Sequence, residues 1–326
     1  MRLPINLRAI HLVAILLIGL VVAACGSDDG AATAAPLGDV ELPAEPGPVE
    51  EIAVSTPVLA DIVANVVGGR AETWSVVPVG ADPHTFEPTP RDLVRLSRAD
   101  LFVQMGANLE NYATEGPWRS ALRDSAVPVL TYADHLDLIT IDRVIDHGDH
   151  THDLTGGDPH VWLDPLRAQD LVDITVSALS SMDPAAADFY RANGDAYRDE
   201  LQAIHDEYIA TIERIPEERR QLIVFHDAYT YFEDRYGFEV IGVVIRNPQA
   251  EPSAREVAEL NELVRDAGVN VVFREPQYDA AILTQLARDQ GIEVGVLMTD
   301  TLTDQVQSYL DLMRFNLRSL EEHLTE

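Results

Sequence analysis

The chain has 326 residues, of which 46% are hydrophobic and 24% charged, values that exclude a disordered polymer, a collagen-like repeat and a membrane protein with many spans. Its 23 basic residues, all arginine, stand against 55 acidic residues and give a formal net charge of -32. This charge argues against a nucleic-acid partner, which needs a basic face, and suits a cationic ligand better.

The first residues have the features of a secretory signal. Two arginines precede an apolar stretch, residues 12–24, which is too short for a membrane span of about 20 residues. Small residues then lead to Cys25, the only cysteine, in a pattern that resembles a bacterial lipobox. We therefore predict a signal peptide over residues 1–24, then a lipidated Cys25 and a flexible tether over residues 25–49. The lipid would anchor the protein outside the cell membrane; ordinary cleavage beside an incidental cysteine is the alternative.

Residues 50–183 begin with apolar runs that alternate with helical patterns. Strands are expected at residues 52–55, 73–79, 101–105 and 127–130, and helices at residues 57–67, 90–98 and roughly 110–122. Runs that are buried on both faces and separated by helices are typical of a parallel sheet. We predict an N-terminal α/β lobe here.

A region with helical patterns only follows. Residues 166–181 are predicted to form one helix, and Pro184 can begin a second that continues to residue 215. At a rise of 1.5 Å per residue, these roughly 32 residues would span ~48 Å. A helix of this length is a stiff connection, so residues 184–215 are predicted to join two lobes.

The remainder, residues 216–326, returns to alternating strands and helices. Strands are expected at residues 221–225, 239–245, 269–273 and 293–297, and helices at residues 228–235, 253–266, 279–290 and 303–323. The predicted fold class is therefore α/β, with two Rossmann-like lobes of mainly parallel sheets joined by one long rigid helix.

Four side chains that can bind metal fall near the ends of predicted elements. His84 and His226 each follow a strand, Asp300 follows the last strand, and His160 precedes a helix. Ligands of α/β sheets bind beyond the carboxyl ends of the strands, and three imidazoles with a carboxylate suit Zn²⁺ or a related divalent ion. Each residue alone could instead serve in packing or capping, and Asp300 could cap the helix expected three residues later.

Six short segments resemble the cluster A-I solute-binding proteins of bacterial metal ABC transporters. They are DPHTFEP at 82–88, GANLE at 106–110, DPHVWLDP at 158–165, FHDAY at 225–229, FREPQ at 273–277 and TDTL at 299–302. They occur in the family's order over nearly all of the mature chain. The resemblance implies a metal ion in a cleft between the lobes, held by His84 and His160 of one lobe and by His226 and Asp300 of the other. Thr301 departs from many relatives but leaves the neighbouring carboxylate unaffected.

The resemblance also implies a function. Manganese-type relatives tend to have glutamate at the third ligand position, where zinc-type relatives keep a histidine, and here the residue is His226. We therefore expect an extracytoplasmic, monomeric lipoprotein that delivers zinc to an ABC permease, with manganese or iron as the alternative ion. A secreted metallohydrolase is a second alternative, disfavoured because four protein ligands would close the position that catalytic zinc keeps open. A role in cell adhesion is a third.

An acidic segment, residues 146–153, contains His147, His150 and His152. Zinc-type relatives often carry a longer histidine-rich loop at this place. We expect a mobile loop that either captures a metal ion weakly and passes it inward or is only solvated.

Two further groups lie close to the candidate ligands in sequence. The family has a glutamate at the position of Glu275, which is expected either to line the cleft behind the ligands or to be structural. Tyr229, Tyr231 and Phe232 follow His226 and either wall the site or pack their helix against the sheet.

Overall fold

The computed structural model describes residues 42, 47–110, 120, 122–140, 144–146, 151–153, 157–245 and 252–325, all of which belong to one compact unit that begins at Leu37. The predicted signal peptide, Cys25 and most of the predicted tether lie outside the described residues. None of the helices described is both long and apolar enough to cross a membrane.

The first sheet is parallel throughout, with the strand order β2-β1-β3-β4. Its strands are β1 (Glu51–Val54), β2 (Glu72–Ser75), β3 (Leu101–Gln104) and β4 (Val129–Thr131). All four were predicted, but β2 is shorter than expected. After β2, the N–H groups of Val76 and Val77 still donate to the carbonyl oxygens of Val54 and Ser55. Pro78 ends this series because proline has no N–H to donate.

Helices α1 (Pro57–Val67) and α2 (Pro90–Leu96) begin where the sequence predicted. The Thr56 side chain caps α1, and Gly68 ends it in a left-handed conformation with φ +56°. The helix expected over residues 110–122 falls largely outside the described residues.

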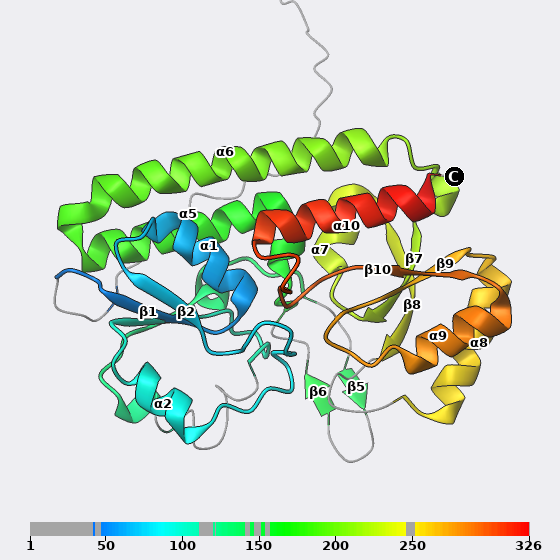
Figure 1. Cartoon of the computed structure of the whole chain (residues 1–326), viewed down its shortest axis with the longest axis horizontal. Coiled ribbons are helices and arrows are strands. Elements are labelled where there is room, and N and C mark those ends of the chain that lie inside the picture. The colour runs from blue at the N-terminus through cyan, green and yellow to red at the C-terminus, as the bar shows by residue number, and fades with distance from the viewer. Residues whose placement is uncertain are drawn as a thin grey trace, which may run out of the picture. The chain divides into compact units, whose positions relative to one another are not determined.

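The long helix is α6 (Ala187–Ile212), with 26 residues. It is shorter than predicted, roughly 39 Å at 1.5 Å per residue, because a single 3-10 turn, η4 (Pro184–Ala186), precedes it. Helix α6 packs on α5 (Pro165–Met182) and α1 and also on α10 (Tyr309–Leu324), so it contacts both halves of the chain (Figure 1). Other short 3-10 turns are η1 (Tyr132–His135), η3 (Val161–Leu163) and η5 (Glu217–Arg219).

The C-terminal half repeats the topology of the first sheet. Its strands are β7 (Gln221–His226), β8 (Glu239–Ile245), β9 (Val271–Arg274) and β10 (Glu293–Val296), and its further helices are α7 (Thr230–Tyr236), α8 (Ala254–Ala267) and α9 (Ala281–Gln290). Strands β7 and β8 pair in parallel, as do β9 and β10, and β7 lies beside β9. The predicted α/β class with parallel sheets and a long helix is thus confirmed.

Two sequence predictions need correction. Helix α10 begins at Tyr309 rather than at residue 303, because Thr303 and Val306 form a closed turn with two backbone hydrogen bonds and Ser308 is the N-cap. Asp300 therefore does not cap this helix. Within the segment expected to be a loop, strands β5 (Val144–Asp146) and β6 (Thr151–Asp153) pair antiparallel, as suits their β-branched residues.

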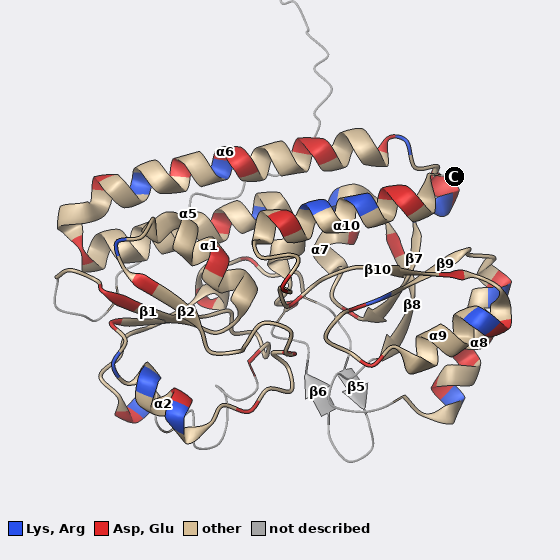
Figure 2. Ribbon diagram, in the orientation of Figure 1, with Lys and Arg blue, Asp and Glu red and all other residues tan. Residues whose placement is uncertain are grey.

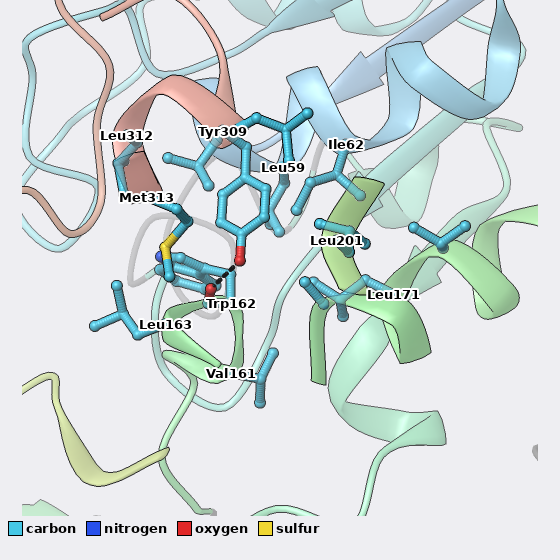
Figure 3. Packing of buried hydrophobic residues seen from close by; sticks show 14 of the residues in the cluster. Leu59, Ile62, Val161, Trp162, Leu163, Leu171, Leu201, Tyr309, Leu312 and Met313 are labelled. Atoms are coloured by element: carbon cyan, nitrogen blue, oxygen red, sulfur yellow. Dashed lines mark hydrogen bonds between the residues drawn. The ribbon is translucent and has the colours of Figure 1, made fainter. Parts of the chain in front are cut away.

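One hydrophobic core extends through both halves. Figure 3 shows Trp162 of η3 among Leu59 and Ile62 of α1 and Met313 of α10, with Tyr309 beside it. The Tyr309 hydroxyl donates a hydrogen bond to the Trp162 carbonyl oxygen, and both residues are fully buried. Both acidic and basic positions occur along α6 and α10, and acidic positions also occur on strands such as β1 (Figure 2).

The contact between α5 and α6 yields a prediction. A methyl group on Gly194 would lie 2.6 Å from Cγ2 of Val176. Alanine is favoured over glycine in helices by about 0.8–1 kcal/mol, but an overpacked helix contact costs about 1–3 kcal/mol. We expect Gly194→Ala to lower the free energy of unfolding by about 1 kcal/mol, measured by urea denaturation. Adding Val176→Ala should recover part of this loss; a Gly194→Ala protein more stable than wild type would contradict the prediction.

Candidate metal centre

Three imidazoles and one carboxylate converge at one point. His84, His160, His226 and Asp300 each offer one ligand atom, and these atoms all lie within 4.8 Å of one another. The Asp300 carboxylate lies 3.3 Å from Nε2 of His226, 3.6 Å from Nε2 of His160 and 3.8 Å from Nε2 of His84. All four residues that the sequence singled out therefore face one another, although they come from distant parts of the chain.

The secondary structure explains why these side chains meet. His226 is the last residue of β7, His84 lies in the loop after β2, and Asp300 follows β10. Each leaves a parallel sheet at the carboxyl ends of its strands, where side chains of different strands come together. His160 directly precedes η3, which leads into α5.

The distances fit a tetrahedral ion. Zinc bonds of about 2.0–2.1 Å place the ligand atoms of a tetrahedron roughly 3.3–3.4 Å apart. The separation of the Nε2 atoms of His160 and His84 is 3.4 Å, and the distances to Asp300 begin at 3.3 Å. Nε2 of His226 and both carboxylate oxygens of Asp300 are buried without a hydrogen-bond partner among the described residues. A cation at the centre would satisfy these atoms.

Two carboxylates orient the imidazoles from behind. Oδ1 of Asp158 lies 2.7 Å from Nδ1 of His160, and Oε1 of Glu275 lies 2.7 Å from Nδ1 of His226. Each carboxylate accepts a hydrogen bond from Nδ1–H, so Nε2 of each imidazole faces the centre. Glu275 is 1% exposed and contacts the His226 imidazole at Nδ1, on the side away from the centre.

Asp158 was not predicted, although the sequence held a signal for it. The triplet Asp-Pro-His occurs at residues 82–84 and again at residues 158–160. In both, the aspartate Oδ1 accepts a hydrogen bond from the histidine N–H, at 3.0 Å for Asp82 and 2.9 Å for Asp158. The repeated triplet is therefore one local turn used twice to present a histidine.

Aromatic side chains contact His226 and the turn that carries His160, and others pack against one another. The Tyr231 hydroxyl donates to the Asp158 carbonyl oxygen at 2.9 Å and so supports the histidine turn. Phe232 packs against other rings, including Tyr236 at 5.0 Å, and Tyr229 is 3% exposed. Tyr278 packs edge-on against the His226 ring at a centroid distance of 5.6 Å.

The described side chains do not test the weaker histidine signal. His147 and His150 fall outside the described residues, and for His152 only its place in β6 is described.

Burial and charge divide the imidazoles into two kinds. Burial lowers the pKa of His84 to about 3, despite the nearby charge of Asp300. Burial also lowers the pKa of His160 and of His226, but the carboxylates that face them outweigh it and raise both pKa values above the usual 6.5. For Asp300, burial raises the pKa, but the three imidazoles, with His226 foremost, outweigh it and lower the pKa below its usual range. Near pH 7 Asp300 is therefore a carboxylate and His84 a neutral imidazole, whereas the carboxylates that face His160 and His226 favour the protonated forms of these two imidazoles.

This arrangement yields a prediction for the metal-free protein. Asp300→Asn removes the negative charge 3.3 Å from Nε2 of His226, and since that charge favours the protonated imidazole, the pKa of His226 should fall. NMR titration of the histidines in EDTA-treated protein would measure the change. Asp304→Asn, which changes an exposed aspartate four residues away, is the matched control and should leave the pKa in place. An unchanged His226 pKa in Asp300→Asn would contradict the assigned charges.

Comparison with known proteins gives a consistent family match. The family model described as zinc-uptake complex component A, periplasmic (ZnuA), matches residues 52–323. The manganese-binding lipoprotein MntA of Halalkalibacterium halodurans is 27% identical over 316 residues, which cover 96% of this chain and 97% of MntA. The zinc-binding protein AdcA of Streptococcus pyogenes serotype M1 is 26% identical over 291 residues, covering 84% of this chain and 56% of AdcA.

Solved structures share the fold. The periplasmic zinc-binding protein TroA of Treponema pallidum superposes with a TM-score of 0.73 at 24% identity, covering 85% of this chain and 100% of TroA. At this identity the likeness concerns the arrangement of elements alone.

Proposed function

Because the chain belongs to the zinc-uptake complex component A (ZnuA) family of metal-binding proteins of ABC transporters, we propose that Zn²⁺ is the ion it captures. The proposed ligands are His84, His160, His226 and Asp300, and the ion is the transported substrate rather than a resident cofactor. The observation that carries this proposal is the spacing of the four ligand atoms, all within 4.8 Å, at distances that suit a tetrahedral ion.

The donor set supports zinc over manganese, although relatives of this chain are named for either metal. Zn²⁺ accepts a four-coordinate, nitrogen-rich site, whereas Mn²⁺ prefers more oxygen donors and more ligands. Both oxygens of Glu275 are engaged, one by His226 and the other by Gln277 at 2.8 Å, so this carboxylate does not supply a fifth ligand. Zinc also exceeds manganese in the general order of affinities.

The charges of the site support a capture step in which metal replaces protons. His84 has the most exposed side chain of the four, at 12%, so the ion would enter past it. An imidazole binds metal only when its ligating nitrogen has lost its proton, so Zn²⁺ would displace one proton each from His160 and His226. The two positive charges of Zn²⁺ would then replace one proton on each of these two histidines, so the total charge of the buried site would not change.

We place the protein outside the cytoplasm, anchored through a lipid on Cys25, with an ABC permease as the partner that receives the ion. Relatives of this chain include a protein named as a lipoprotein. We assign the two lobes to residues 50–183 and 216–326, with residues 184–215 as the connection. The protein would act as a monomer, and its four protein ligands leave no position for a catalytic water, which supports transport over hydrolysis.

A first test measures how zinc affinity depends on pH and how many protons zinc binding releases. Zinc affinity should fall as the pH falls through the raised pKa values of His160 and His226, because protons compete for both. The pKa of about 3 keeps His84 neutral throughout this range. Calorimetry at pH 7 in buffers of different ionisation enthalpy should therefore show up to two protons released per zinc ion. Release of three, or an affinity that does not change between pH 7.5 and 5, would contradict the assigned states.

A second test addresses the identity of the metal. Elemental analysis after reconstitution should give one zinc ion per wild-type chain. His226→Glu supplies an oxygen donor and should lower the ratio of zinc to manganese affinity, chiefly by weakening the binding of zinc. His135→Glu, which changes a histidine of η1, is the control and should preserve the ratio. If the ratio of zinc to manganese affinity stays the same or rises in His226→Glu, His226 is not a metal ligand. Wild-type protein that does not bind metal in a one-to-one ratio would refute the proposal.

A further inference from the structure

Thr299 lies at the junction of the polar groups behind the metal ligands. It follows β10 and immediately precedes Asp300, and it is fully buried. Its backbone and its side chain make hydrogen bonds in two different directions, one toward η3 and one toward β9. None of the sequence signals assigned it a role beyond membership of the segment TDTL.

The backbone of Thr299 is bonded to the segment that carries His160. Nε1 of Trp162 donates to the Thr299 carbonyl oxygen at 2.9 Å, and Trp162 lies two residues after His160. The indole also packs edge-on against the His160 ring at a centroid distance of 5.4 Å. The Trp162 carbonyl is itself held by the Tyr309 hydroxyl, so the indole is fixed at both its ring and its backbone.

The side chain of Thr299 is bonded to the carboxylate that orients His226. The Thr299 hydroxyl donates to Oε2 of Glu275 and accepts a hydrogen bond from Nε2 of Gln277 at 3.2 Å. The other oxygen of Glu275, Oε1, faces Nδ1 of His226 at 2.7 Å. A hydroxyl has one proton to give, and here it is directed at the buried carboxylate.

We propose that Thr299 is a positioning residue for three of the metal ligands. It sets Asp300 through the chain, His226 through Glu275, and His160 through Trp162. This inference rests on the proposed function, because positioning matters only where the four side chains bind a metal. A tetrahedral site requires its ligands in fixed directions. Loss of the Thr299 hydroxyl leaves Oε2 of Glu275 held by Gln277 alone among the described residues and so loosens the carboxylate that orients the His226 imidazole.

The test compares one substitution that removes the hydroxyl with one that keeps it. Thr299→Val removes the hydroxyl and keeps the branched shape, whereas Thr299→Ser keeps the hydroxyl. Groups that hydrogen-bond a ligand directly usually contribute 10- to 100-fold to metal affinity, and Thr299 acts one residue further out, so Thr299→Val should weaken zinc binding by about 3- to 10-fold. Thr299→Ser should stay close to wild type.

A spectroscopic readout separates positioning from stability. Four-coordinate Co²⁺ absorbs visible light more strongly than five- or six-coordinate Co²⁺, so its spectrum reports the ligand geometry. Bound Co²⁺ should lose intensity in Thr299→Val and keep it in Thr299→Ser. Thr175→Val is the matched control, because Thr175 is also fully buried and its hydroxyl bonds Tyr132 at 2.6 Å. It should lower the urea midpoint without changing the Co²⁺ spectrum.

The outcomes distinguish this inference from the proposed function. Wild-type protein that takes up neither Zn²⁺ nor Co²⁺ would overturn both. Wild-type binding together with an unchanged affinity and spectrum in Thr299→Val would overturn the positioning role alone, as would a Thr175→Val protein with the same spectral loss. If Thr299→Val does not fold, Trp162→Phe removes the other bond to Thr299 and should produce the same loss of Co²⁺ intensity; an unchanged spectrum there would equally overturn the role.

Discussion

The buried charge of Asp300 is the interaction on which the site depends. Its carboxylate is fully buried, and three imidazoles face it. A lone carboxylate in such a place would cost several kcal/mol of desolvation and would become protonated instead. Protonation of His160 and His226, which the carboxylates around them favour, can supply the compensating positive charge, and so can a divalent cation.

A second layer of carboxylates holds two of these imidazoles in position. Asp158 and Glu275 each hold a histidine by its Nδ1, which raises the pKa of the imidazole and also directs its Nε2 at the centre. His84 has a pKa lowered to about 3 and is the most exposed of the four side chains. The site thus combines one neutral and more exposed imidazole with two buried imidazoles whose protonated forms are favoured.

The fold brings these groups together through its shared core. The two sets of parallel strands have the same order, and both present ligands beyond their carboxyl ends. Trp162 lies in the common hydrophobic cluster and donates to the backbone beside Asp300, so packing and ligand placement depend on the same side chain. The long helix α6 contacts helices of both halves and supports this arrangement.

The sequence by itself determined the α/β class, most strands and helices, and the four side chains that meet, because strand ends, glycine stops and ligand-type residues are local signals. It misjudged the start of α10, since a closed turn at Thr303 delays the helix to Tyr309. It left two roles open for Glu275, and although the Asp-Pro-His triplet is repeated, Asp158 was not predicted to orient an imidazole. It could not reveal that Thr299 lies between Glu275 and Trp162. The contacts of Glu275 and Thr299 join residues far apart in the chain, and the opposite pKa shifts of the histidines depend on distances and burial that only the tertiary structure decides.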